Sequence, residues 1–305
     1  PYKEFTFGEQ LGFAWQLYSL KANLVHFGMT HQPIMYLKKT VTTVHDLTTV
    51  RFRNPAKNWA VFKFKQWVYR GVVWIVAHKS ERIITPSEFV KQDLAHYAKI
   101  RLSKIAVTNE AADRIEEKPE PIKELEGKDF LLYVGRALPH KNLKVAVDAL
   151  QEVKWNHPGL RLVFAGKVDA NYRKLEAYAK SKKVADVVFT DFVTDPQLRW
   201  LYEKSRAYVF PSLSEGFGLP GLEAMLYDLP VLSSRVTCLP EIYKDAAIYF
   251  DPKSSKDLAL KMQQLLDDPE LAKKMAAAGR KLVKQYSWQK MAEETHEIYL
   301  KILNK

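Results

Sequence analysis

Short apolar runs alternate with amphipathic segments along most of the chain. Runs of β-branched and apolar residues predict buried strands, and apolar positions three or four residues apart predict helices. In the first part of the chain the predicted strands are residues 24–27, 39–46, 82–87 and 104–109, and the predicted helices are residues 5–21, 57–74 and 88–97. Alternating strands and helices indicate a parallel sheet, with ligand sites at the carboxyl ends of its strands.

A second alternating series begins at Phe130, after a stretch rich in Glu, Lys and Pro that has no apolar period. Its predicted strands are residues 130–135, 160–165, 187–192, 207–210, 230–234 and 247–250, separated by predicted helices at 142–153, 172–183, 196–204 and 222–227. This series is a complete doubly wound unit. The predicted domains are residues 1–115 and 129–286, with a linker at 116–128 and a final helix at 287–305 that either caps the second domain or crosses back to the first.

Composition narrows the class of protein. The chain has 305 residues, of which 47% are hydrophobic and 27% charged, as in a globular protein of about two domains. Its one cysteine, Cys238, excludes an internal disulfide framework and favours a reducing compartment, hence a cytoplasmic location. The formal charge of +12 is spread among acidic residues without basic blocks, so nucleic acid is not the expected partner.

A tryptophan-rich, basic stretch at residues 57–74 has two interpretations. Trp59, Trp67 and Trp74 share one face of a helix, with Lys63, Lys65 and Arg70 nearby. Such a helix can lie on an anionic membrane surface, which would place the protein at the inner face of a membrane. The alternative is a core helix with a solvated basic side.

The loop after residues 207–210 is the strongest candidate for chemistry. Gly216 and Gly218 allow backbone to approach a bound group, and a helix begins near Pro220, where free N–H groups attract an anion such as phosphate. Glu215 and Glu223 bracket the loop and can face one ligand. The plainer reading is a helix-capping glutamate with turn glycines.

Two cations follow the first strand of the second series. Arg136 comes directly after a strand that ends in glycine, and Lys141 stands at the start of the next helix. A guanidinium fork and an ammonium at this edge suit a diphosphate. As an alternative, they are solvated surface cations.

The Glu215 to Glu223 loop, with the sequence Glu-Gly-Phe-Gly-Leu-Pro-Gly-Leu-Glu-Ala, resembles the signature of the retaining glycosyltransferases of family 4. The resemblance implies a GT-B fold, in which two Rossmann-like doubly wound domains face a cleft. Family members open with more strands than this chain, so the resemblance implies an N-terminal domain that is incomplete at its start. Asp228 also stands where the family usually has glycine.

The resemblance implies a role for each residue of the loop and its surroundings. Glu223 would bind the donor ribose, and Glu215 with the backbone of Gly216, Phe217 and Gly218 would hold the transferred sugar. The remaining implied contacts are Arg136, Lys141, Gly218 and Leu219 for the diphosphate and, for the nucleobase, Phe192 and Val193.

His45 and Asp46 stand at the end of a predicted strand and resemble the family's His-Asp pair, which faces the donor sugar. The resemblance assigns them, with Glu215, to catalysis. A histidine at a strand end can also be purely structural. No metal-binding motif and no Asp-x-Asp arrangement is present in the sequence, so no cofactor or metal is expected.

The expected function is therefore metal-independent transfer of a mannose- or glucose-type hexose from a GDP- or UDP-linked donor. The acceptor would be a saccharide or lipid-linked hydroxyl in polysaccharide synthesis. Two rivals stay open. One is a protein that binds nucleotide sugars without turnover because its acceptor half is missing, and the other is a GT-B epimerase or phosphorylase, against which the Glu215 to Glu223 loop argues.

Overall fold

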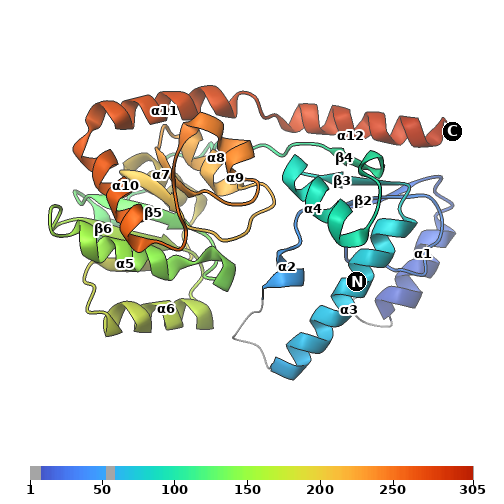
Figure 1. Ribbon diagram of the computed structural model, residues 1–305. Coiled ribbons are helices and arrows are strands. Elements are labelled where there is room, and N and C mark those ends of the chain that lie inside the picture. The colour runs from blue at the N-terminus through green and yellow to red at the C-terminus, as the bar shows by residue number, and fades with distance from the viewer. Residues whose placement is uncertain (1–7, 53–58, 305) are drawn as a thin grey trace. The chain divides into compact units, whose positions relative to one another are not determined.

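The computed structural model describes residues 8–52 and 59–304, and the chain divides into two compact units. The first unit holds Pro1–Arg53, Lys57–Glu110 and Ser287–Lys305, and the second holds Asn54–Ala56 and Ala111–Tyr286. Each unit is built on its own parallel sheet (Figure 1). The starts of two predicted helices, at Phe5 and at Lys57, lie outside the described residues.

The sheet of the first unit has four parallel strands in chain order. They are β1 (Val25–Phe27), β2 (Thr40–Thr43), β3 (Arg82–Thr85) and β4 (Ile105–Val107). All of β2 is buried. The Thr42 hydroxyl lies 3.0 Å from Gln32 Nε2 and 2.9 Å from Ser80 Oγ, so this polar group stays hydrogen-bonded in the core. β2 is shorter than predicted, which leaves His45 and Asp46 in the loop that follows it.

Helices cover the first sheet. They are η1 (Gly8–Phe13), α1 (Ala14–Ser19), α2 (Thr48–Arg51), α3 (Trp59–Lys79), α4 (Glu88–Ala98), η2 (Leu102–Lys104) and α12 (Trp288–Leu303). Helix α4 agrees closely with its predicted bounds, α3 extends five residues beyond the predicted end at Trp74, and the short α2 and η2 were not predicted. The Ser87 hydroxyl accepts a hydrogen bond from Val90 N and begins α4, as the sequence predicts. The last helix, α12, lies along this unit (Figure 1), and its Ile298 and Ile302 pack with Val41 of β2 and Ile84 of β3.

The second sheet has six parallel strands in the order β10-β9-β8-β5-β6-β7. Their bounds are β5 (Phe130–Val134), β6 (Arg161–Ala165), β7 (Val187–Asp191), β8 (Ala207–Phe210), β9 (Val231–Ser234) and β10 (Ala247–Phe250). All of β8 and the first four residues of β5 are buried, as expected for central strands covered on both faces. The order reverses between β5 and β8, which makes their carboxyl ends the topological switch point.

The second unit carries the remaining helices. They are η3 (Lys123–Leu125), η4 (Pro139–Lys141), α5 (Leu143–Val153), α6 (Ala170–Ser181), α7 (Asp195–Lys204), α8 (Leu219–Leu226), α9 (Leu239–Tyr243), η5 (Lys244–Ala246), α10 (Ser255–Asp267) and α11 (Pro269–Val283). Helix α5 packs beside α6 and α10 (Figure 1). The segment after Ala111 packs on this unit, because Ile115 N donates to the Tyr227 hydroxyl and the Arg114 guanidinium stacks on the Tyr227 ring.

Candidate active site

The candidate site lies at the switch point of the second sheet, where the loops after β5 and β8 meet. Asn142 joins these loops, because its Nδ2 donates to the carbonyl oxygens of Pro211 at 3.2 Å and Pro252 at 2.8 Å. Leu213 N donates to His140 O at 2.7 Å. Asn142 adopts a left-handed backbone, with a φ of 56°, which asparagine tolerates better than most residues. The loop that contains Lys141 is thereby fixed against the loop that contains Glu215.

Lys141 and Glu215 form the central contact of the site. Lys141 Nζ lies 2.6 Å from Glu215 Oε1, and the two side chains are only 18% and 12% exposed. The same ammonium lies over the Phe210 ring, 5.6 Å from its centroid. Glu215 N donates to Thr237 Oγ1 and Cys238 Sγ donates to Glu215 O, so the backbone of this glutamate is also fixed. The predicted phosphate-binding cation and the predicted sugar-binding carboxylate therefore lie together.

The turn from this loop into α8 depends on Gly218. Its φ of 102° is in the region that favours glycine, and a Cβ there would lie 2.5 Å from the Tyr243 hydroxyl. That hydroxyl donates a hydrogen bond to Gly218 O. Leu219 is the first residue of α8, so its N–H belongs to the free, positively polarised end of the helix. The Phe217 ring packs edge-on against Tyr286 in the core, which leaves only its backbone for a ligand.

Glu223 lies one turn further along α8 and is partly buried. The Tyr202 hydroxyl donates to Glu223 Oε2 at 2.9 Å. Burial raises the pKa of Glu223, and the Tyr202 hydrogen bond partly opposes that rise. Both Glu223 and Glu215 act electrostatically on Tyr208, whose pKa is raised mainly by burial. The charges of both carboxylates therefore oppose ionisation of the same buried phenol.

Arg136 lies at the same edge of the sheet but is not joined to the Glu215 loop. It follows Gly135 at the end of β5 and is 69% exposed, with Nη2 3.5 Å from Asp169 Oδ2. Asp169 also accepts from Asn171 N and Tyr172 N and so begins α6. Arg136 thus has one weak ionic contact and an exposed fork.

The predicted nucleobase residues follow β7. Phe192 is 77% exposed, and Val193 is partly buried. β7 is an edge strand of the second sheet, and β6 separates it from β5. The Phe192 ring therefore presents an open apolar surface at the carboxyl edge.

His45 and Asp46 lie in the first unit, each with partners of its own. His45 Nδ1 lies 2.8 Å from Glu110 Oε1, and His45 Nε2 lies 3.0 Å from Gly28 O. The hydrogen bond to Glu110, together with the nearby charges, raises the pKa of His45 against the effect of burial. Asp46 Oδ1 accepts from the N–H of Thr48, the first residue of α2, at 2.7 Å.

Four of these supporting residues escape sequence reasoning: Glu110, Asn142, Tyr202 and Tyr243. Three of them contact a predicted residue that is distant along the chain; Glu110, for example, is 65 positions from His45. Asn142 instead binds the carbonyls of Pro211 and Pro252. Asn142 had a usable signal, because an asparagine directly before a helix indicates a cap or a left-handed turn. The two tyrosines look like ordinary core residues in the sequence.

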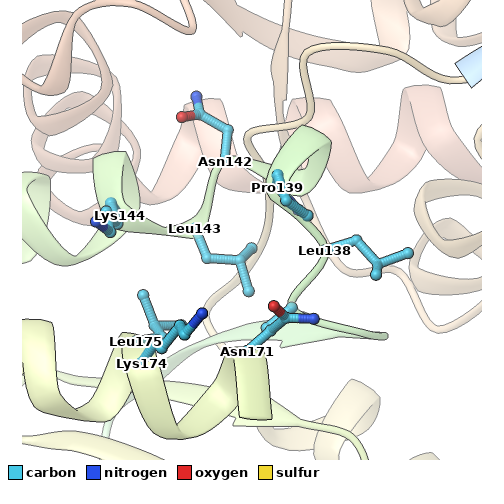
Figure 2. A pocket seen from close by; sticks show the side chains of 9 residues that line it. Leu138, Pro139, Asn142, Leu143, Lys144, Asn171, Lys174 and Leu175 are labelled. Atoms are coloured by element: carbon cyan, nitrogen blue, oxygen red, sulfur yellow. The ribbon is translucent and has the colours of Figure 1, made fainter. Parts of the chain in front are cut away.

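A pocket of about 280 Å³ lies behind the loop that contains Lys141, between the start of α5 and helix α6. Figure 2 shows Leu143 and Leu175 among the side chains that line it, with Lys144 on α5 and Lys174 beside Leu175 on α6. None of the predicted site residues lines this pocket. It is therefore separate from the Lys141 and Glu215 site.

Residues 8–52 and 59–304 lack two further features. No group of three or more His, Cys, Asp or Glu side chains in these ranges is arranged to hold a metal ion. No helix within them is both long enough and apolar enough to cross a membrane.

Two Rossmann-like α/β units, the second with charged residues at its switch point, form the architecture of the GT-B glycosyltransferases. Residues 114–282 match the sequence profile of the family described as glycosyl transferases group 1. The chain belongs to this family and is a glycosyltransferase.

Similar proteins agree with this assignment. The O-antigen chain mannosyltransferase B of Escherichia coli is 27% identical over 94% of this chain and 76% of its own length. Sucrose-phosphate synthase from Thermosynechococcus elongatus has a TM-score of 0.78 at 20% identity, over 97% of this chain and 78% of that one. Anabaena Alr3699/HepE, in complex with UDP and glucose, has a TM-score of 0.76 at 15% identity, over 97% and 83%. At these identities the two structures support the fold alone.

Proposed function

We propose that this glycosyltransferase is a retaining hexosyltransferase of family 4 that takes a mannose- or glucose-type sugar from a GDP- or UDP-linked donor. The acceptor is a saccharide or lipid-linked hydroxyl in polysaccharide assembly. The contact between Lys141 and Glu215 carries the proposal, because it joins a cation suited to a diphosphate with a carboxylate suited to a sugar. The mannosyltransferase relative supports the substrate class.

Each group at the switch point has a role in donor binding. Lys141, the exposed fork of Arg136 and the N–H groups at Gly218 and Leu219 hold the diphosphate without a metal ion. Glu223 accepts hydrogen bonds from the ribose hydroxyls. Glu215 and the backbone at Gly216 and Phe217 hold the hexose, and Phe192 and Val193 contact the base.

The transfer proceeds on one face of the sugar. The bond between the anomeric carbon and the diphosphate oxygen breaks as the acceptor oxygen forms its bond to the same carbon on the same face. The acceptor proton moves to the departing diphosphate, so that group serves as the base. Arg136 and Lys141 stabilise the negative charge that develops on it, and Glu215 offsets positive charge at the anomeric carbon.

In the first unit, His45 and Asp46 are proposed to act toward the donor sugar. With Nδ1 and Nε2 both directed at oxygen acceptors, His45 has no free ring nitrogen with which to act as a base. The proposal also includes a cytoplasmic location with peripheral contact to an anionic membrane at its inner face.

The first test measures binding and transfer separately. A thermal-shift panel of UDP, GDP and ADP identifies the nucleotide, and NMR of the product formed from the matching sugar donor reports the anomeric configuration. Lys141→Ala removes a charge-assisted contact, so nucleotide diphosphate affinity falls about tenfold or more. Glu223→Ala also weakens nucleotide affinity, whereas Glu215→Gln mainly lowers turnover.

Lys144→Ala is the matched control, because Lys144 lies three residues away and contacts the Tyr178 ring instead of the site. It should bind nucleotide like the unchanged chain. Stabilisation by nucleotide without transfer to any acceptor would favour the rival binding protein. A product of inverted configuration, or Lys141→Ala that binds like Lys144→Ala, would contradict the proposal.

A further inference from the structure

Helix α3 of the first unit has an apolar outward face. Its buried side consists of Tyr69, Val73, Val76 and Ala77, which face the core. Positions three or four residues apart share one side of a helix. The side that faces away from the core is exposed throughout and consists of Ala60, Phe64, Trp67, Gly71, Trp74 and His78.

This outward face differs from that of an ordinary surface helix. A helix packed on a core usually turns charged residues toward water. Here Phe64 is 65% exposed and Trp67 is 71% exposed, and Trp59 and Trp74 are each about half exposed. A shallow apolar pocket lined by Ala60, Val61, Phe64, Lys65 and Val68 lies on the same helix. Large aromatic side chains in such a group mark an interaction surface.

The charges beside this face are all positive. Lys63, Lys65 and Arg70 are exposed, and α3 contains no Asp or Glu. Lys63 lies 4.7 Å from the centroid of the Trp59 ring, which holds one cation against the aromatic group. Residues 1–110 contain 16 of the 47 Lys and Arg residues but only seven of the 35 Asp and Glu residues, so +9 of the formal +12 belongs to this part.

We infer that the outward face of α3 docks on the surface of an anionic lipid bilayer. Tryptophan and phenylalanine enter the boundary between headgroups and acyl chains, and the flanking cations contact anionic headgroups. Charge favours this partner over a second copy of the chain, because pairing α3 with itself would bring like cations together. The inference deepens the proposed function by assigning its membrane contact to one helix.

Flotation with vesicles tests the inference on the full chain. Vesicles of phosphatidylcholine and phosphatidylglycerol should carry the protein, whereas vesicles of phosphatidylcholine alone should carry much less. Added salt should release the protein from the anionic vesicles. Phe64→Ser with Trp67→Ser should weaken partitioning about tenfold or more, and Lys63→Gln with Lys65→Gln should weaken it about fivefold for each lysine.

Trp155→Ser is the matched control for the aromatic exchange, because Trp155 is 89% exposed and lies in the second unit. Lys180→Gln with Lys273→Gln is the control for charge, since both lysines are exposed and belong to that unit. Both controls should float like the unchanged chain. Circular dichroism and thermal melting show that each variant is folded.

Three results would overturn the inference. They are failure to float with anionic vesicles, equal flotation of the α3 variants and the controls, and a dimer in light scattering that dissociates when Trp67 is replaced. The assay contains neither donor nor acceptor. A failed vesicle result therefore leaves the transferase proposal standing, and a failed transfer assay leaves the docking result standing.

Discussion

At the scale of single residues, the environment of His45 determines its protonation. The Gly28 carbonyl can only accept a hydrogen bond, and Glu110 is a carboxylate acceptor, so both ring nitrogens donate. We predict that Glu110→Gln brings the pKa of His45 back toward its ordinary value of 6.5, because the amide oxygen accepts a hydrogen bond without supplying a negative charge. Proton NMR of the histidine ring signals over a pH series measures this change.

The contact between His45 and Glu110 should also make the stability of the folded protein depend on pH. The folded-state pKa of His45 is raised, so the pair stabilises the fold fully below the unfolded value of 6.5. That contribution is lost as pH rises through the folded value. Since His45 is half exposed, the gain is small. Asp46→Asn is the comparison, because Asp46 contributes last among the causes of the shift. An unchanged His45 titration in Glu110→Gln would contradict the prediction.

At the same scale, sequence could predict site residues but not their partners. Lys141 and Glu215 stand in short glycine- and proline-marked loops after apolar strands, and this local pattern is visible in one dimension. The contacts of Glu110 with His45 and of Tyr202 with Glu223 depend on tertiary packing, which no local spacing encodes. The sequence predicts one property of Asp228 but not the other. Its φ of 59° fits a position where the family has glycine, and Arg280 Nε binds its carboxylate at 2.6 Å.

At the scale of elements, α8 and α9 are packed without space for one methyl group. A Cβ on Gly221 would lie 2.5 Å from Cζ of Tyr243, whose hydroxyl holds Gly218 O. We predict that Gly221→Ala destabilises the protein by about 1–3 kcal/mol, although alanine favours helices. Tyr243 must move, so the turn before α8 should loosen and nucleotide affinity should fall. Chemical denaturation and nucleotide titration measure the two effects.

Gly71→Ala is the control, since a Cβ in the middle of α3 meets nothing within 4 Å. The same exchange there should stabilise the protein by about 0.5–1 kcal/mol. If Gly221→Ala were also neutral or stabilising, the close packing of α8 on Tyr243 would not restrict the site.

Elements with strong periodicity were predicted well, and short ones were missed. The bounds of β8 and β10 are as predicted, because each is an apolar run between polar turns. The five-residue α9 and the four-residue α2 are too short to show a helical period. The Asp46 carboxylate accepts from the N–H of Thr48, the first residue of α2, so the residue that resembles a catalytic aspartate also has a structural role.

At the scale of the whole molecule, the last helix belongs to the first unit, although it follows the second in the chain. Ile298 and Ile302 of α12 pack against Val41 and Ile84, and Tyr299 Oη lies 2.5 Å from His26 Nδ1. The packing of α12 on the first unit joins residues some 260 positions apart in the chain. Lys39 Nζ, for example, donates to the backbone oxygen of Ile302, 263 positions away. The sequence therefore predicts the final helix but does not determine which of the two domains it packs on.

Because each unit has its own sheet and core, we predict that the two units unfold in separate transitions. Ile298→Ala removes buried apolar volume from the first unit, which should cost about 2–4 kcal/mol there. The second unit keeps its own sheet and its own core, so a nucleotide that binds it should still raise its melting temperature. Scanning calorimetry should then show an early transition insensitive to nucleotide and a later one that nucleotide shifts. Leu300→Ala, at an exposed position of the same helix, should leave the trace unchanged. A single transition that Ile298→Ala lowers as a whole, with or without nucleotide, would mean that the two units unfold as one.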